Sequence, residues 1–177
     1  MKYMAIIGIV IGAAVVYGVL HDQITVRICL EYFTVGHPPL FGLREPTLLA
    51  LGWGVVATWW VGAALGWVIA FAARYGTWPK LEPHEILRPL GMLFATVACF
   101  ALISGLIGYI AAVNHWVNLN PFLADLIPPE KHVAFLVDLW SHCASYVGGF
   151  FGGIGLAGYI AFQRRRRHQA SINPARG

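Results

Sequence analysis

Charged residues are scarce in this sequence of 177 residues: Asp, Glu, Lys and Arg make up only 11% of it, whereas a soluble domain usually carries about 25%. The hydrophobic fraction is 58%, and the mean hydropathy is +0.66. This composition excludes a soluble globular enzyme, an intrinsically disordered chain and a nucleic-acid-binding domain. It indicates an integral membrane protein, and the length suits one domain.

Recognisable catalytic and metal-binding motifs are also missing. The sequence contains three cysteines and no CxxC pair, which excludes a thioredoxin-like motif and a zinc ribbon. No HExxH or paired ExxH motif occurs either. The motif inventory therefore leaves open whether the protein is an enzyme.

Long apolar runs are what the sequence has in abundance. Four of them reach the length of roughly 18 residues that identifies a membrane-spanning helix. Their approximate bounds are 3–20, 47–73, 90–113 and 133–162. We therefore predict an all-α fold, a bundle of four transmembrane helices that occupies residues 1–163. The first run is long for a signal peptide and no A-x-A cleavage site follows it, so a retained span is favoured.

The distribution of Lys and Arg predicts the orientation of these spans. Nine of the 12 basic residues fall at the N-terminus, in the loop between the second and third runs, or in residues 164–177. By the positive-inside rule we predict that both termini are cytoplasmic and that residues 164–177 form a basic cytoplasmic tail. Cys29 and Cys143 then lie on the outer side, where a disulfide is an alternative to two free thiols.

Glycine is concentrated in the last apolar run. Its glycines are Gly148, Gly149, Gly152, Gly153, Gly155 and Gly158. Small residues let membrane helices approach closely, because no water-driven force brings helices together in lipid. The expected partners are thus the lipid bilayer and the neighbouring helices. Formation of a homo-oligomer or of a larger membrane complex through this run is the alternative.

Residues 21–46 are too polar for the bilayer core and too apolar for a disordered linker. Ile24, Val26 and Ile28 alternate with polar residues, which predicts a short strand. A short interfacial helix is the alternative, because Tyr32 and Phe33 suit the headgroup zone. Either element would give the bundle a structured outer loop between the first and second spans.

Three motifs fall in or near this region: HDQIT at 21–25, EYFT at 31–34 and ATWW at 57–60. In this combination the sequence resembles a family of small bacterial multi-span integral membrane proteins that carry HDQ-[IV]-[ST], EYFT and ATWW segments. The resemblance covers roughly residues 15–67. It implies a multi-span fold in a bacterial inner (cytoplasmic) membrane, and it supplies no catalytic residues.

Histidine and aspartate gather at the predicted outer ends of the spans. The candidate metal ligands are His21, Asp22, His115, Asp138 and His142. Asp138 and His142 share a helix face, and ionisable groups in a span turn towards the bundle interior because lipid exposure is costly. Imidazole and carboxylate together suit Zn²⁺ or Fe²⁺. The competing interpretation, which the missing motifs favour, is a set of hydrogen-bonded polar pairs that fix the helix ends.

Two functions remain in competition. The short loops, the glycine-rich last run and the missing catalytic motifs favour a structural or accessory component of a larger membrane system. The alternative is a membrane enzyme or binding protein with an outward-facing His/Asp metal site. A transporter or channel is less favoured, because neither an internal repeat nor a broken polar helix is apparent.

Overall fold

The structure, a computed structural model, describes residues 1–172, and all the regular secondary structure in this part of the protein is helical. Four helical segments are long and apolar enough to cross a membrane, as expected. They are α1 (Lys2–Ile28), α3 (Pro46–Val56) together with α4 (Trp59–Arg74), α5 (Leu87–Val113) and α7 (His132–Ile172). The shorter elements are α2 (Leu30–Thr34), η1 (Pro83–Ile86), α6 (Pro121–Leu126) and η2 (Pro129–Lys131).

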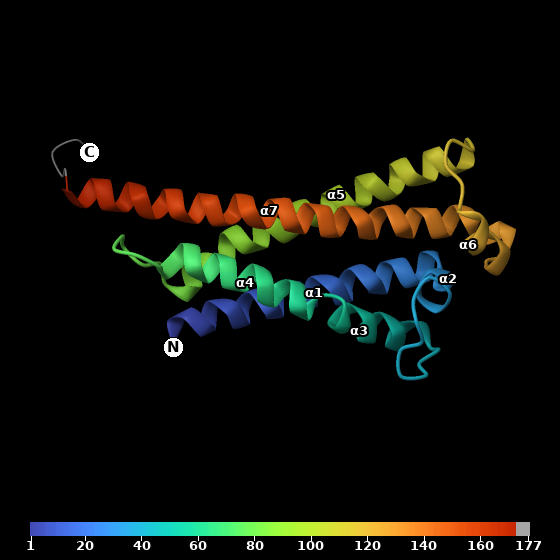
Figure 1. The fold of residues 1–177 in the computed structure, drawn as a ribbon, viewed down its shortest axis with the longest axis horizontal. Helices are drawn as coiled ribbons and strands as arrows, with labels where there is room; N and C mark the ends of the chain where they lie inside the picture. The colour runs from blue at the N-terminus through green and yellow to red at the C-terminus, as the bar shows by residue number, and fades with distance from the viewer. Residues whose placement is uncertain (173–177) are drawn as a thin grey trace.

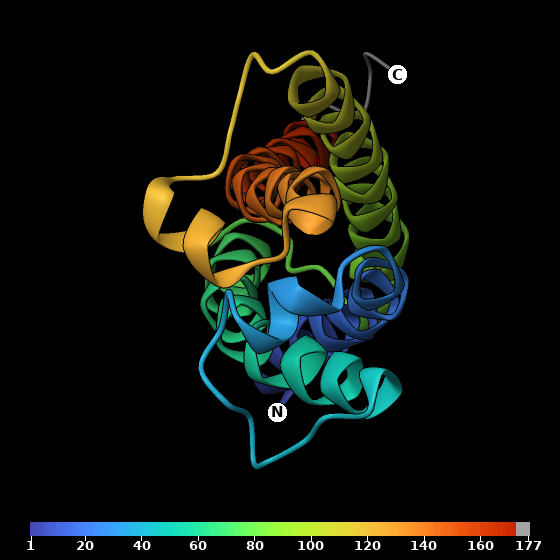
Figure 2. The same ribbon diagram turned by 90° about the vertical axis from the view of Figure 1, so that its right-hand side faces the viewer.

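The four segments form two closely packed pairs. α1 packs along α3 and α4, α5 packs along α7, and α4 joins the pairs by its contact with α7. Figure 1 shows the start of α1 and the end of α7 at one end of the bundle and α2 and α6 at the opposite end, called the α2/α6 end below. Seen from that end in Figure 2, the near end of α5 stands apart from the near end of α1. The contact between α1 and α5 is correspondingly small.

Glycine permits the close approach of the first pair. A Cβ on Gly54 would lie 2.6 Å from the Cα of Val19, and one on Gly62 would lie 2.8 Å from the Cα of Ile11. These are backbone contacts that no larger side chain could accommodate. On α7, by contrast, a Cβ on Gly155 or Gly158 would meet no heavy atom within 4 Å outside its own part of the helix, and both glycines are exposed. The glycine-rich run therefore leaves part of its surface open.

The first helix extends further than its apolar run. Residues 21–28 form its last two turns, so the predicted strand is wrong. Asp22, Thr25 and Val26 are buried on one face of these turns, and this spacing follows the helical period. Tyr32 and Phe33 lie in the short helix α2. A helix satisfies its backbone hydrogen bonds internally, as an isolated strand next to lipid does not.

The second span is interrupted at Ala57 and Thr58, which the sequence did not reveal. α3 begins at Pro46, where the carboxylate of Glu45 accepts a 2.8 Å hydrogen bond from the Leu48 amide. Accepted backbone hydrogen bonds lower the pKa of Glu45. At the other end of α3 the hydroxyl of Thr58 donates to the carbonyl of Gly54. Such back-bonding competes with the helical ladder and bends helices.

The last helix reaches beyond its apolar run and includes the start of the predicted tail, whose residues 173–177 lie outside the described part. Arg164 on this helix is buried, with an exposed fraction of 3%. Its guanidinium donates to four backbone carbonyls at the end of α4 and in the following loop, those of Ala72, Tyr75, Trp78 and Pro79. One residue of the predicted basic tail is therefore part of the folded bundle.

Candidate metal site between α1 and α7

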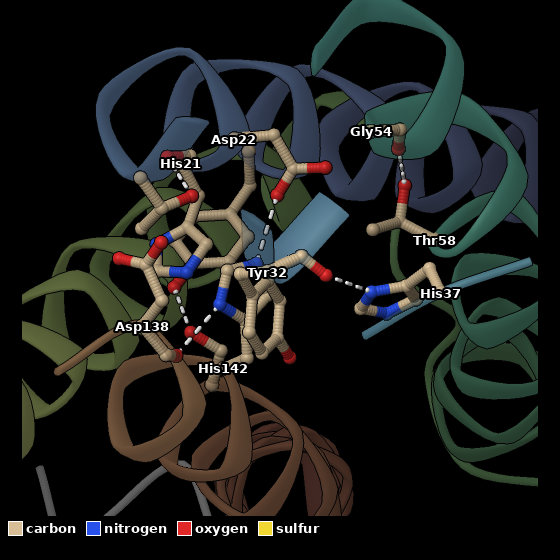
Figure 3. Close-up of polar contacts among 11 residues, drawn as sticks. His21, Asp22, Tyr32, His37, Gly54, Thr58, Asp138 and His142 are labelled. Atoms are coloured by element: carbon tan, nitrogen blue, oxygen red, sulfur yellow. Dashed lines mark hydrogen bonds and ion pairs between the residues drawn. The ribbon is translucent and has the colours of Figure 1, made fainter. Parts of the chain in front are cut away.

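Three of the predicted ligands come together between α1 and α7. His21 and Asp22 lie near the end of α1, and His142 lies ten residues into α7, about 15 Å along the helix axis from its start. One ligand atom from each residue lies within 4.8 Å of the other two. Figure 3 shows their side chains turned towards one another from the two facing helices. Residues 120 positions apart thus form one polar cluster.

The hydrogen bonds of His142 fix its tautomer. Its Nδ1 lies 2.8 Å from the backbone oxygen of Asp138, to which it can only donate. In a neutral ring the lone pair is then on Nε2, which lies 3.3 Å from Oδ1 of Asp22. Two acceptor atoms face each other, so a proton or a metal ion must lie between them. Metal-binding histidines commonly donate their other N–H to a backbone carbonyl in this way.

The ring of His21 offers a further unused nitrogen. Its Nε2 is buried and has no hydrogen-bond partner within residues 1–172. The ring stands edge-on to that of His142, with their centroids 4.6 Å apart, and stacks on Tyr17. A buried ring nitrogen without a partner is costly unless a proton acceptor, a proton donor or a metal ion completes it.

Asp138 is fully buried one turn before His142. Both of its carboxylate oxygens lack a hydrogen-bond partner in the described part of the chain. An uncompensated buried carboxylate is strongly unfavourable, so this group requires either a proton or a nearby cation. It lies beside the cluster but does not belong to the group of three residues whose ligand atoms converge.

His115 does not join the cluster. It lies just after the last turn of α5, exposed and with a φ of 57°. Because α5 diverges from α1 towards the α2/α6 end, a residue beyond its last turn is carried away from His21. Histidines from three spans were predicted to converge. Only two of them do so, His21 on α1 and His142 on α7.

Aromatic residues from α2 and the loop behind it cover the cluster. The ring centroid of Tyr32 lies 4.4 Å from that of His142, and the ring centroid of Phe33 lies 5.8 Å from it. His37 packs between Phe33 and Trp53 and binds the backbone oxygen of Tyr32. These residues were not among the predicted site residues, although the EYFT motif contains two of them. Burial raises the pKa of Tyr32, so its hydroxyl remains neutral.

The cysteines take no part in the cluster. Cys29 is buried and Cys143 is exposed, and both are free, so the alternative of a disulfide between them is wrong. Burial raises the pKa of the Cys29 thiol to about 12. A thiol with this pKa is protonated at neutral pH, whereas a metal ligand must be a thiolate.

The cluster borders a cavity of ≈ 90 Å³ in the bundle. The three converging residues line it, together with Tyr17, Ser145 and residues of α2, α3 and α4. All three motif segments contribute to its wall, through HDQIT at 21–25, EYFT at 31–34 and ATWW at 57–60. The interruption between α3 and α4 is part of this wall. The motifs therefore share one location in the fold.

Comparisons with known protein families, with curated proteins and with solved structures gave no match. The arrangement of the residues is thus the basis for a functional conclusion.

Proposed function

We propose that the protein is a membrane metal-binding protein that holds one divalent transition metal ion, Zn²⁺ or Fe²⁺, through His21, Asp22 and His142. The observation that carries this proposal is the 3.3 Å approach of two acceptor atoms, Nε2 of His142 and Oδ1 of Asp22. A cation between them converts a repulsive contact into two bonds. The buried, partnerless Nε2 of His21 supplies the third ligand.

Charge balance supports the same proposal. Asp22 and Asp138 are buried, with exposed fractions of 5% and 0%. If Asp138 beside the cluster is ionised, the two carboxylates balance the charge of one divalent ion, and a low-dielectric interior tolerates this neutral arrangement far better than isolated charges. Two histidines and one carboxylate are also the ligand set of many zinc and non-haem iron sites that keep a coordination position open. Here an open position would face the cavity.

The competing function is a structural or accessory component of a larger membrane system. The open glycine face of α7 favours it, because Gly155 and Gly158 are exposed and a Cβ on either would meet no atom of another described helix within 4 Å, and small residues promote close helix association. In that case His142 and Asp22 form a plain ion pair with a protonated imidazole. The two functions differ in one measurable quantity, the metal content.

Metal analysis of the purified protein tests the proposal. We expect about one zinc or iron ion per chain after purification without chelator. After removal by a chelator, Co²⁺ should rebind with the absorption spectrum of an ion held by nitrogen and oxygen ligands. Protein that contains less than about a tenth of an equivalent and does not take up Co²⁺ would contradict a metal site.

We further propose that the α2/α6 end faces the outside of a bacterial inner membrane, with α2 in the headgroup zone. The excess of Lys and Arg at the opposite end supports this orientation. A reporter inserted at Asn118 is expected to report the outside, and one fused to Gly177 the cytoplasm. The reverse result at Gly177 would exclude this topology.

A further inference from the structure

A second, larger hollow lies on the other side of α1. It is a groove of ≈ 830 Å³ between α1, α5 and α7, formed where α5 diverges from α1. Its walls are mostly apolar and include Leu20, Ile24, Leu102 and Val137. All three helices belong to segments apolar enough to cross a membrane. In a bilayer this groove therefore faces hydrocarbon.

The groove and the metal-site cavity share a wall. Tyr17 and His21 line both of them. The hydroxyl of Tyr17 lies 2.7 Å from that of Ser145 on α7, so this hydrogen bond links α1 to α7 at the boundary. The ring of His21 is thus accessible to a molecule in the groove. On the cavity side, the same ring lies next to Asp22 and His142, the other two residues of the candidate metal site.

Access from water is obstructed at the α2/α6 end. The rings of Tyr32 and Phe33 pack on His142, and His37 and Trp53 continue this aromatic layer. The lateral route through the groove is lined by side chains that a lipid tail contacts without desolvating a charge. A ligand that reaches the site from the bilayer is therefore favoured over one that arrives from water.

The dimensions of the groove fit one leaflet. The lining residues of α5 run from Ala98 to Tyr109, about 16 Å along the helix, which is close to half of a hydrocarbon core of about 30 Å. At the outer end stands Glu130, the one carboxylate among the described residues that line the groove. This placement suits an acyl chain inside the groove and a cationic amine at its rim.

We infer that the groove binds one phosphatidylethanolamine molecule, with an acyl chain between α1, α5 and α7 and its ammonium group at Glu130. The lipid then lies against the ring of His21, which also lines the metal-site cavity. This inference goes beyond the proposed function and does not depend on it. The lipid binding itself depends only on the groove.

Lipid retention tests the binding. Protein released from nanodiscs of phosphatidylethanolamine and phosphatidylglycerol is expected to retain one phosphatidylethanolamine in native mass spectrometry. Ala98→Phe places a ring in the groove and should lower this retention roughly tenfold. Ala64→Phe is the matched control, because Ala64 is exposed on α4 and does not line the groove. Glu130→Gln leaves the groove open and should abolish the preference over phosphatidylglycerol.

The outcomes separate this inference from the proposed function. Equal retention by wild type, Ala98→Phe and Glu130→Gln, or no retained lipid, overturns the lipid site whatever the metal content. Failure of Co²⁺ to bind overturns the proposed function and does not affect the conclusion about lipid binding.

Discussion

Replacing His142 by alanine is expected to weaken metal binding strongly. In the proposed site the imidazole is one of three protein ligands, and its Nδ1 hydrogen bond to the Asp138 carbonyl orients the ring towards Asp22. Loss of an outer-shell partner alone typically weakens metal binding 10–100-fold. Loss of the ligand itself should exceed this, so we expect an affinity for Zn²⁺ lowered by more than about 100-fold. Competition with a chromogenic chelator measures it.

His115→Ala is the matched control for this variant. His115 is an exposed histidine near the same end of the bundle and lies outside the cluster. Its removal should leave the affinity for Zn²⁺ unchanged. If His115→Ala and His142→Ala lower the affinity equally, the metal binds to surface histidines and the buried cluster is not its site.

A second substitution at the same position separates the metal site from a plain polar pair. His142→Gln keeps a hydrogen-bonding side chain but provides a poor metal ligand. If His142 and Asp22 only pair with each other, the melting temperature of His142→Gln should stay close to that of the wild type without chelator. If they hold an ion, this variant should melt as low as chelator-treated wild type, because binding stabilises the folded state.

The four spans were predictable because hydropathy alone determines them. Runs of about 20 apolar residues can satisfy their backbone in lipid only as helices. The ends of the helices were not predictable in the same way. His21 to Ile28 are polar enough to resemble a loop, yet they form the last turns of α1 because one face of them, including Asp22 and Thr25, packs inside the bundle. Burial by tertiary contacts decides such boundaries.

The sequence predicted the types of residue in the candidate site, but it did not predict which of these residues come together. Asp138 and His142 were correctly placed on one buried helix face, because their spacing is local. Whether His115 joins them depends on the angle between α5 and α1, which no sequence pattern encodes. The aromatic cover was missed for the same reason: His37 reaches the site only because the loop after α2 folds back over it.

The break in the second span illustrates a further limit. A Thr within an apolar run is common and rarely interrupts a helix, so Thr58 gave no signal. Here its hydroxyl binds the Gly54 carbonyl at the point where Gly54 packs against the backbone of α1. Close packing on one side and back-bonding on the other together produce the interruption.

The guanidinium of Arg164 should be the most important single side chain for stability outside the candidate site. It reaches four carbonyl oxygens at distances of 2.6–3.0 Å and ties the end of α4 and its loop to α7. Hydrogen bonds to a charged group contribute about 1.5–3 kcal/mol each, and a buried carbonyl left without a donor is penalised. Because such contributions are not additive, we expect Arg164→Ala to destabilise the protein by roughly 3 kcal/mol or more.

Two further variants make this prediction specific. Arg165→Ala removes an equal charge from an exposed neighbour and should leave the melting temperature in detergent nearly unchanged, since exposed charges contribute little. Arg164→Lys keeps the charge, but a single ammonium group cannot match the planar fork that serves four carbonyls. It should therefore behave more like Arg164→Ala than like the wild type. If Arg164→Lys has the same melting temperature as the wild type, the position requires only a positive charge, and the role of the guanidinium fork is refuted.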